Sequence, residues 1–395
     1  MIVDGIQPAA VVTPGDVGEL AATLATAAAA RQATVISGGG TKLSWGRTPA
    51  RVDLVVSTGK LTRLVAHRYG DLTATIESGA PLADVNRQLA KHGQWLPLDS
   101  AFADATIGGI VASNDSGPLR HRFGTPRDLL IGVTLALADG RLVKAGGNVV
   151  KNVAGYDLGR LVTGSFGSFA AITTATFKLS PVFAASGTVG VFYRDAEGIG
   201  RDAQLLAANQ FELTALDVQA TLGAIRGALR LLVRVASSPA ATEAQLAAIR
   251  RMVTGEAELI TGGAEDELWR DQVGTPWIAD STVVRLAWLP ASLATVLTAI
   301  DRVGRESGAA LTFTGRAAVG AGMVRVDGSP EGTVAVIEEL RRSDAIGNVV
   351  VLRAPAAVKS RIDVWGPPRD VAPVLRAIKN ALDPSGILNA GRGPI

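Results

Sequence analysis

Three consecutive glycines, Gly38, Gly39 and Gly40, stand directly before Thr41 and Lys42 and directly after a short β-branched run. Backbone N–H groups in a tight glycine turn form a concave array of donors that suits phosphate oxygens, and the Thr41 hydroxyl and Lys42 ammonium add further donors. An ordinary tight turn after a strand is the alternative interpretation. The chain has no G-x-G-x-x-G that opens a helix after a strand and no complete P-loop, so Rossmann and P-loop sites are disfavoured.

Two further stretches concentrate small and hydrogen-bonding residues. In the stretch 96–130 these residues surround a pair of glycines: Thr106, Gly108, Gly109, Ser113, Asn114, Ser116 and Gly117. The stretch 145–173 adds Lys151, Gly155, Tyr156, Asp157 and a small-residue turn at Gly164 to Gly167. A surface made of such small, hydrogen-bonding residues can pack closely against a flat ligand that carries phosphates. Three such segments in one part of the chain favour a ligand site over three unrelated turns.

Alternating strands and helices position these segments. Apolar periodicity and turn residues predict strands at 34–38, 53–58 and 72–79 and helices at 14–31 and 80–93. A hairpin at 132–147 turns at Asp139 and Gly140, and a strand at 170–182 follows it. We therefore expect a first domain boundary near residues 181–185.

Beyond that boundary the pattern becomes a more even mixture of strands and helices. A set of strand, helix, two strands and helix runs from 188 to 253, and a comparable set recurs from 281 to 354. This loose duplication suits a sheet that helices cover on one face, and indicates a cap domain. Residues 256–269 are interpreted as a solvated helical face, and a last helix at 369–384 leads into the C-terminal tail.

Composition narrows the class of protein. The chain has 395 residues, of which 47% are apolar, enough for two or three packed units. Its 39 basic residues nearly balance 36 acidic ones, so nucleic acid is not an expected partner. The absence of cysteine excludes disulfides, thiolate metal sites and an iron–sulfur cluster held by this chain. Asp4 and Pro8 argue against a secretory signal, and the uncharged run at 161–177 is too short and polar to span a membrane, so we expect a cytoplasmic protein.

Four motifs together resemble the FAD-binding oxidoreductases of the vanillyl-alcohol oxidase and p-cresol methylhydroxylase (PCMH) type: "SGGGTK", "ATIGGIVASNDSG", "KNVAGYDLGRLVTGSFGSFAAIT" and "LDPSGILNAGR". The third motif looks most like the FAD-binding subunit of bacterial glycolate oxidase. The resemblance covers roughly the first 180 residues and the tail. It implies an α+β fold: a PCMH-type FAD-binding domain of two subdomains at 1–183, a ferredoxin-like α+β cap domain at 184–368, and a C-terminal segment at 369–395 that returns to the flavin domain.

The resemblance also implies which residues bind FAD. The three glycines would let the loop wrap the diphosphate, with Thr41 as a further donor. Gly108 and Gly109 would pass beside the diphosphate and the ribityl chain, Ile172 would use its main chain, and Asn389 would return towards the isoalloxazine. The full expected set is Gly38, Gly39, Gly40, Thr41, Lys42, Thr106, Gly108, Gly109, Ser113, Asn114, Gly117, Ile172 and Asn389. Relatives that attach the flavin covalently use histidine or cysteine; the chain has no cysteine and its glycine loop has no histidine, so FAD should bind non-covalently.

Catalytic residues are not identified. Oxidation of a 2-hydroxy acid needs a base for the hydroxyl proton and a cation or metal for the carboxylate. The catalytic subunits that this chain resembles supply these from a histidine motif in the cap and C-terminal region, which is missing here. His67 and His92 are interpreted as surface or loop residues, none of the three histidines has a partner at metal-ligand spacing, and His121 remains as a titratable candidate beside the second motif. Arg316 is interpreted as a surface arginine, with an anion clamp as the alternative.

The expected function is that of the FAD-binding subunit of a glycolate oxidase (glycolate dehydrogenase) complex that oxidises glycolate to glyoxylate. A catalytic flavin subunit would take the hydride and an iron–sulfur subunit would accept the electrons, in a hetero-oligomer that reaches the inner face of the membrane only through its partners. One alternative is a self-sufficient FAD-dependent 2-hydroxy acid or alcohol dehydrogenase with His121, Tyr156 or Lys151 as base. A further alternative is a flavin-free structural subunit of the same complex.

Overall fold

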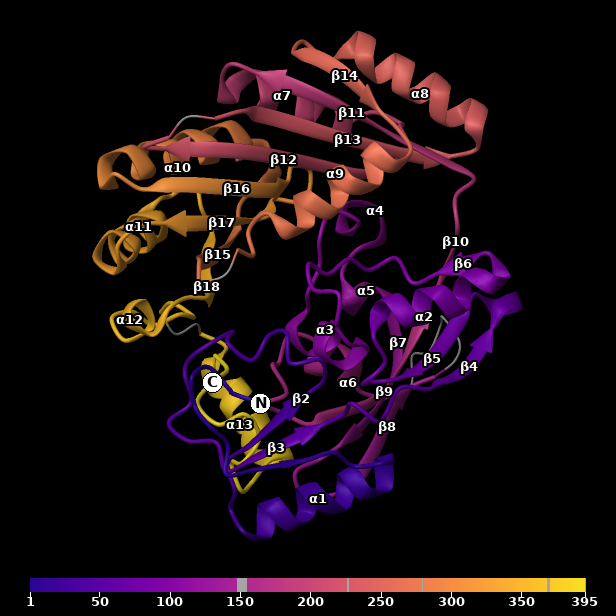
Figure 1. Ribbon diagram of the computed structural model, residues 1–395, viewed down its shortest axis with the longest axis vertical. Helices are drawn as coiled ribbons and strands as arrows, with labels where there is room; N and C mark the ends of the chain where they lie inside the picture. The colour runs from indigo at the N-terminus through magenta and orange to yellow at the C-terminus, as the bar shows by residue number, and fades with distance from the viewer. Residues whose placement is uncertain (148–154, 226, 279, 368–369, 395) are drawn as a thin grey trace. The chain divides into compact units, whose positions relative to one another are not determined.

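The computed structural model describes residues 1–147, 155–225, 227–278, 280–367 and 370–394. The chain divides into two compact units (Figure 1). The first unit comprises Met1–Ser116, Gly124–Val182 and Pro367–Ile395, and the second comprises Gly117–Phe123 and Phe183–Gly366. The short segment Gly117–Phe123 therefore packs with the second unit, although it lies early in the sequence. The predicted bounds, a flavin domain at 1–183, a cap domain at 184–368 and a segment at 369–395 that returns to the flavin domain, stay a prediction.

A three-stranded parallel sheet begins the first unit. Its strands run in the order β1 (Ala10–Val12), β3 (Leu54–Ser57) and β2 (Thr34–Ser37). Helix α1 (Val17–Ala29) begins at Asp16, whose side chain accepts a hydrogen bond from the Glu19 N–H at 2.9 Å. The buried face of α1 packs on Leu54 and Val56 of β3. The loop of three glycines leaves this small sheet at the end of β2.

A five-stranded antiparallel sheet forms the rest of the first unit. Its strands run in the order β4 (Leu64–Arg68), β5 (Thr73–Glu77), β9 (Ala171–Lys178), β7 (Leu130–Ala136) and β8 (Leu142–Gly146). The predicted hairpin between β7 and β8 is confirmed, with Gly140 at φ +84° in its turn. The remaining elements of this unit are α2 (Leu82–Leu89), α3 (Ile107–Ser113), α5 (Pro126–Leu129), α6 (Leu158–Val162), α13 (Ala372–Leu382), β6 (Gln94–Trp95), β10 (Ser180–Pro181), η1 (Tyr69–Asp71) and η2 (Ala90–His92). Helices α2 and α3 share one apolar core with this sheet.

An eight-stranded antiparallel sheet dominates the second unit. Its order is β14 (Glu256–Ile260), β11 (Ala185–Tyr193), β13 (Leu229–Ser237), β12 (Leu213–Gly223), β16 (Ala310–Arg316), β17 (Ala321–Asp327), β15 (Thr282–Ala287) and β18 (Asn348–Arg353). Each half follows the order strand, helix, strand, strand, helix, strand, and the two halves join where β12 pairs with β16. The ferredoxin-like pattern is therefore confirmed, and it occurs twice.

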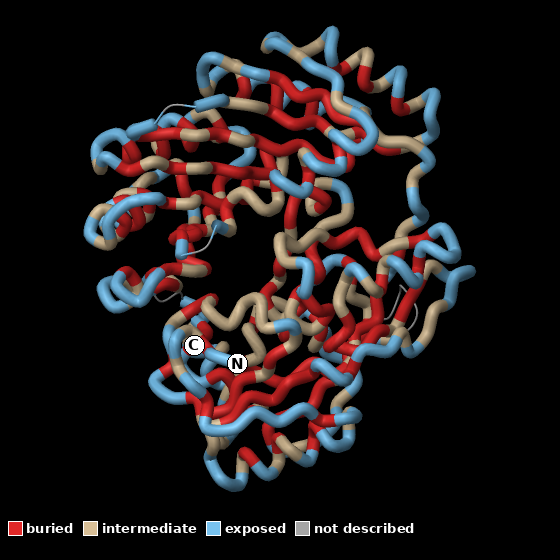
Figure 2. The backbone as a smooth tube through the Cα atoms, viewed as in Figure 1, coloured by how far each residue is buried: buried red, intermediate tan, exposed pale blue. Residues whose placement is uncertain are grey.

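Four helices cover one face of this sheet: α7 (Ala196–Ala207), α8 (Pro239–Met252), α10 (Leu293–Ser307) and α11 (Pro330–Arg342). The core between them and the strands is the red interior of this unit in Figure 2. Helix α9 (Gly263–Gly274) packs instead on Ala215 and Leu232, which face the other side (Figure 1). The short elements α4 (Arg120–Phe123), α12 (Ala356–Lys359) and η3 (Pro290–Ser292) complete the unit.

The interpretation of residues 256–269 as a solvated helical face is wrong. Residues Glu256–Ile260 form the edge strand β14, which pairs with β11. Helix α9 follows it and buries Glu265 and Trp269, whose exposed fractions are 1% and 7%. The Glu265 carboxylate is satisfied by the hydroxyls of Ser186 and Thr188, at 2.7 and 2.8 Å. A charge-rich segment thus contributes a buried, hydrogen-bonded side chain instead of a solvated face.

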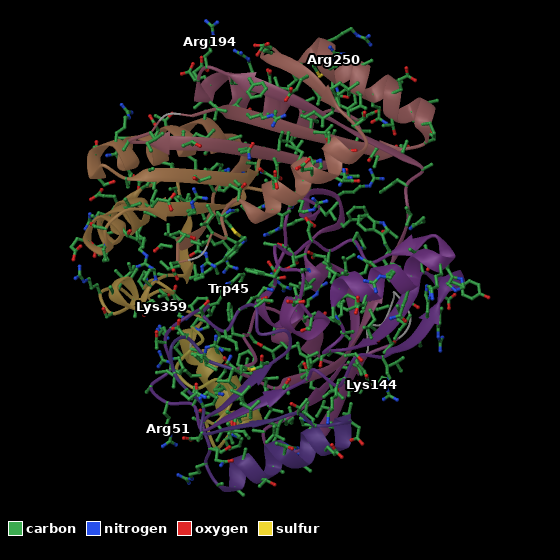
Figure 3. The ribbon with its side chains drawn as sticks, in the orientation of Figure 1. Trp45, Arg51, Lys144, Arg194, Arg250 and Lys359 are labelled. Carbon is green, nitrogen blue, oxygen red and sulfur yellow. The ribbon has the colours of Figure 1, made fainter. Side chains whose placement is uncertain are left out.

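The interpretation of Arg316 as a surface residue is also wrong. Arg316 is 4% exposed and lies opposite Asp217 in the β12–β16 register, with its Nε 3.6 Å from an Asp217 carboxylate oxygen. Gln272 of α9 donates to the same carboxylate at 3.0 Å. Complete burial raises the pKa of Asp217, and the charge of Arg316 opposes this shift. Most cations lie outside instead, as Figure 3 shows for Arg51 and Lys144.

Candidate functional site

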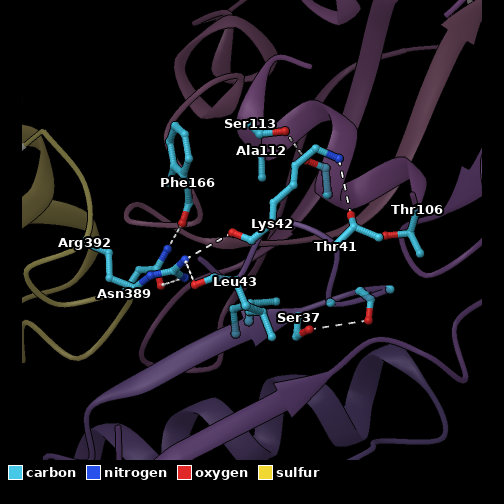
Figure 4. Close-up of a pocket in the computed structure, with 15 residues that line it drawn as sticks. Ser37, Thr41, Lys42, Leu43, Thr106, Ala112, Ser113, Phe166, Asn389 and Arg392 are labelled. Atoms are coloured by element: carbon cyan, nitrogen blue, oxygen red, sulfur yellow. Dashed lines mark hydrogen bonds between the residues drawn. The ribbon is translucent and has the colours of Figure 1, made fainter. Parts of the chain in front are cut away.

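A pocket in the first unit gathers segments that are far apart in the sequence (Figure 4). Its walls come from the end of β2, the glycine loop, helix α3, the turn before β9 and the C-terminal tail. Nine of the predicted FAD-binding residues line it: Gly38, Gly39, Gly40, Thr41, Lys42, Thr106, Gly109, Ser113 and Asn389. The structure thus brings together residues from the first motif, the second motif and the tail.

Four predicted residues lie outside the pocket lining. A side chain at Gly108 would have its Cβ 2.7 Å from the Cβ of Ser78, so this glycine serves a close packing contact. Asn114 ends helix α3 in the left-handed conformation, at φ +49°. Gly117 belongs to the second unit, and Ile172 is a buried residue of β9, opposite Leu135 of β7. Contact of these four residues with FAD stays a prediction.

The third motif contributes less to the described pocket than expected. Lys151 and Asn152 lie outside the described residues. Tyr156 is 92% exposed. Sequence reasoning missed six lining residues: Ile36, Ser37, Leu43, Ala112, Phe166 and Arg392. Phe166 and Arg392 lie inside the third and fourth motifs, so the motifs themselves were the signal, and only the choice of residues was incomplete.

Close approach of another backbone segment explains the glycine loop. A Cβ on Gly38 would lie 2.0 Å from the Thr106 hydroxyl, and a Cβ on Gly39 would lie 1.9 Å from the Asp104 carbonyl oxygen. Gly40 adopts φ +73°, which favours glycine for conformational reasons. The glycines are therefore required first by the protein's own packing between this loop and residues 104–106.

The loop nevertheless leaves donors for a ligand. Within the described part of the chain, the N–H groups of residues 39–42 donate to no protein acceptor. The hydroxyl of Thr106, a residue that is 5% exposed, also has no hydrogen-bond partner among the described residues. Gly39 is exposed and residues 40–42 are half-buried, so a ligand can reach their N–H groups, and the buried Thr106 hydroxyl is a donor that is costly to leave unpaired. This arrangement fits a ligand that brings several acceptor oxygens. The diphosphate of FAD is such a ligand, and residues 39–42 with Thr106 are the groups that would hold it.

Lys42 is held in place by the protein. Its Nζ lies 3.0 Å from an Asp115 carboxylate oxygen, and the two side chains are 10% and 6% exposed. The Asp115 carboxylate also accepts a hydrogen bond from the Ser100 hydroxyl at 2.7 Å. Lys42 Nζ lies 4.9 Å from the centre of the Phe102 ring. Because Asp115 offsets much of its charge, Lys42 supplies the pocket with an oriented donor more than with a full positive charge.

The C-terminal tail closes another side of the pocket. Asn389 adopts φ +52° and its amide donates to the carbonyl of Phe166. Arg392 is 3% exposed, and burial lowers its pKa to about 10. Its charge is therefore present at neutral pH. Lys42 and Arg392 are the ionisable residues among those that line the described pocket.

The histidines lie elsewhere. His67 and His92 form a surface cluster of rings with Tyr69, and Gln94 lies 2.8 Å from the His67 ring. His121 lies on α4, in the second unit. Burial, and then the neighbouring charge of Arg122, lowers the pKa of His121, and its Nδ1 has no partner among the described residues. Within the described ranges, no group of histidine, aspartate and glutamate side chains could hold a metal ion. No helix in those ranges has the length and apolarity to cross a bilayer.

Comparison with known proteins agrees with this geometry. Residues 8–146 match the FAD binding domain family. D-lactate dehydrogenase of Archaeoglobus fulgidus is 35% identical over 43% of this chain and 38% of the relative. Glycolate oxidase subunit GlcD of Bacillus subtilis is 34% identical over 44% of this chain and 37% of the relative, and subunit GlcE of Escherichia coli is 35% identical over 37% of this chain and 42% of the relative. Each match thus spans less than half of the curated relative.

A solved structure of alkyldihydroxyacetonephosphate synthase extends the likeness over both units. It superposes with a TM-score of 0.74 at 15% identity and covers 98% of this chain and 76% of that chain. At this identity the likeness concerns the fold, and it confirms the predicted α+β architecture of flavin domain, cap and returning tail. The predicted cofactor is confirmed by the family match, and the donors around Thr106 suit it. Residues 8–146 are thus similar to the FAD binding domain family, and the cofactor that this match indicates is FAD.

Proposed function

We propose that this chain is the FAD-binding subunit of a glycolate oxidase complex, which oxidises glycolate to glyoxylate. Hydride transfer from glycolate takes place on a larger catalytic flavin subunit, and an iron–sulfur subunit accepts the electrons. This chain holds its FAD non-covalently and acts in electron relay or in assembly. FAD suits a relay because it accepts a hydride and releases electrons one at a time.

The ionisable groups of the described pocket carry this proposal. Oxidation of a hydroxy acid needs a base that takes the hydroxyl proton and a cation or metal that holds the carboxylate. The pocket lining offers only Lys42, which Asp115 engages at 3.0 Å, and Arg392, which donates to backbone carbonyls. Neither is placed to act as a base. The names of two relatives, glycolate oxidase subunits GlcD and GlcE, support the assignment to such a complex.

An anaerobic visible spectrum of the isolated chain, recorded before and after glycolate is added, tests the proposal. We expect a flavin spectrum that glycolate leaves unchanged. Bleaching by glycolate would contradict the proposal, because it would place a complete active site on this chain. The reconstituted complex provides the second arm: if a complex without this chain kept full glycolate-dependent dye reduction, the chain would have no part in turnover.

His121 favours one second candidate, a self-sufficient FAD-dependent 2-hydroxy acid or alcohol dehydrogenase. Because burial lowers its pKa and its Nδ1 has no partner among the described residues, His121 carries a neutral imidazole that could accept a proton. This candidate predicts that some hydroxy acid bleaches the flavin and that His121→Gln abolishes bleaching while FAD content is kept. A colourless protein that takes up no FAD would instead favour a flavin-free structural subunit.

A further inference from the structure

The C-terminal tail is fastened to the first unit beside the pocket. The Thr34 N–H donates to the carbonyl of Ile387 at 2.8 Å, and the Asn389 N–H donates to the carbonyl of Thr34 at 2.8 Å. The tail thus adds to the sheet next to β2, the strand from which the glycine loop leaves. Lys379 Nζ donates to the carbonyls of Ser168 and Leu388, at 2.7 and 2.8 Å. These bonds hold the tail in a fixed register beside the loop.

Arg392 connects this fixed tail to the glycine loop. One of its terminal nitrogens, Nη2, donates to the carbonyls of Lys42, Leu43 and Trp45 at 3.3, 2.8 and 3.0 Å. Its other terminal nitrogen, Nη1, donates to the Asn389 amide oxygen at 3.0 Å. The guanidinium fork lets Nη2 reach the loop carbonyls while Nη1 reaches Asn389 of the tail, two directions that the single nitrogen of an ammonium group could not serve with the same geometry.

The carbonyls that Arg392 engages belong to the stretch that directly follows the unpaired donors. Without Arg392, the carbonyls of Leu43 and Trp45 would lose this donor, while the Lys42 carbonyl would keep the Trp45 N–H at 3.1 Å. The loop would then be free to leave the conformation in which the N–H groups of residues 39–42 stay available to a ligand. Arg392 also brings a buried positive charge to the pocket lining, where it favours the negative charge of a diphosphate.

We propose that Arg392 is a positioning residue for the cofactor: it holds the loop after the three glycines in the conformation whose N–H groups bind the FAD diphosphate. The C-terminal tail is then part of the cofactor site rather than a passive end of the chain. This inference rests on FAD as the cofactor and is independent of the proposed role in glycolate oxidation. The complex could fail to oxidise glycolate while Arg392 still governs FAD affinity.

Titration of the apoprotein with FAD, followed by flavin fluorescence, tests this role in Arg392→Gln and Arg392→Lys. We expect the glutamine variant to bind FAD at least about tenfold more weakly, a factor that corresponds to about 1.4 kcal/mol. The lysine variant keeps the charge but not the forked donors, so its FAD affinity should lie between that of the glutamine variant and that of the unchanged protein. Arg51→Gln is the matched control, since Arg51 is exposed, pairs with Asp53 and does not line the pocket. Its FAD affinity should equal that of the unchanged protein.

Binding of ADP isolates the contribution of the loop, because ADP carries the diphosphate of FAD without its isoalloxazine. We expect Arg392→Gln to weaken ADP binding, measured by displacement of FAD, by the same factor as FAD. Equal FAD affinity in the variant and the unchanged protein would overturn the proposal. So would a loss for FAD with none for ADP, which would place the effect at the isoalloxazine end.

A second variant guards against simple misfolding. Arg47 donates from its side chain to the Gly393 carbonyl at 2.8 Å, so Arg47→Gln loosens the tail without removing the buried charge of Arg392. We expect a smaller weakening of FAD and ADP binding in the same direction. Thermal melting of each apoprotein accompanies the titrations. If the loss of affinity appeared only in variants whose apoprotein had already unfolded, Arg392 would be structural and the proposal would be wrong.

Discussion

At the scale of residues, the glycine loop shows why a motif can be recognised for one reason and required for another. Positions 38 and 39 require glycine because residues 104–106 pass close by: a Cβ there would lie 2.0 Å from the Thr106 hydroxyl and 1.9 Å from the Asp104 carbonyl oxygen, respectively. Gly40 is small because its backbone has φ +73°. The FAD diphosphate would then bind to N–H groups that this packing leaves accessible. Steric necessity within the fold therefore creates the donor array that the sequence motif indicated.

Gly39→Ala tests the steric part of this account. The added methyl group would meet the Asp104 carbonyl, a backbone atom that cannot swing aside, so the loop or residues 104–106 must shift. We expect a loss of about 2 kcal/mol in the free energy of unfolding, measured with urea, together with weaker FAD binding. Gly70→Ala is the control, because nothing lies within 4 Å of a Cβ there. A Gly39 variant as stable as this control would refute the close-packing account.

His121 should make stability depend on pH. Burial lowers its pKa in the folded state, so between the ordinary value near 6.5 and the lowered value the unfolded chain binds more protons than the folded chain. Stability from the neutral imidazole is complete above about pH 6.5 and declines as the pH falls through that window. We expect the melting temperature to fall less between pH 7.5 and pH 5.5 in His121→Gln than in the unchanged protein.

An exposed histidine provides the comparison for that measurement. His92 stacks on Tyr69 at the surface, with ring centres 5.0 Å apart. His92→Gln should therefore retain the pH dependence of the unchanged protein. If the His121 and His92 variants showed the same pH profile, burial of His121 would not be the source of the dependence.

The motifs predicted which residues line the pocket, but they did not predict the ion pairs of these residues or the donors that have no partner in the protein. The sequence marks Lys42 and the tail, but the hydrogen bonds from Arg392 to residues 42–45 join positions about 350 apart in the chain. No local pattern encodes such a contact, because it depends on how the tail returns. The same holds for Arg316, whose partner Asp217 lies on a strand from the other half of the sheet.

At the scale of elements, prediction succeeded where a segment buries one continuous face. Helices α10 and α11 and strands β12, β13 and β16 carry strong apolar periodicity, and the structure has them near the predicted positions. Strand β14 was missed because it is a five-residue edge strand whose Glu256, Glu258 and Leu259 are exposed. A strand with only one paired neighbour need not alternate apolar and polar residues. Helix α7 begins at Ala196, directly after the capping residue Asp195.

The junction between α13 and the tail should be sensitive to loss of one charge. Asp383 is 1% exposed and accepts hydrogen bonds from Lys379 at 2.6 Å and from the Leu388 N–H at 2.8 Å. Lys379→Met would leave this buried carboxylate without its cation. We expect a loss of about 3 kcal/mol in the free energy of unfolding, measured with urea. Arg376→Gln, an exposed change on the same helix, should be neutral, and an equal loss in both variants would contradict the role of the pair.

At the scale of the whole molecule, the family match covers a smaller part of the chain than the likeness of fold. The family match ends at residue 146, while the solved structure superposes over 98% of the chain at 15% identity. Loops that would bind one fixed cofactor need particular residue types, which makes the motifs of the first unit recognisable. The second unit needs only apolar faces of the correct period, which many sequences satisfy. The motifs therefore predicted the cofactor, but they did not predict the residues that select the substrate.

The finished molecule should hold one FAD per chain without a covalent bond. Covalent attachment needs a nucleophilic side chain at the flavin; the chain has no cysteine, and the lining of the described pocket includes no histidine or tyrosine. Precipitation of the purified holoprotein with trichloroacetic acid should therefore leave all flavin absorbance in the supernatant and a colourless pellet. Flavin fluorescence that stayed with the protein band in a denaturing gel would contradict this expectation.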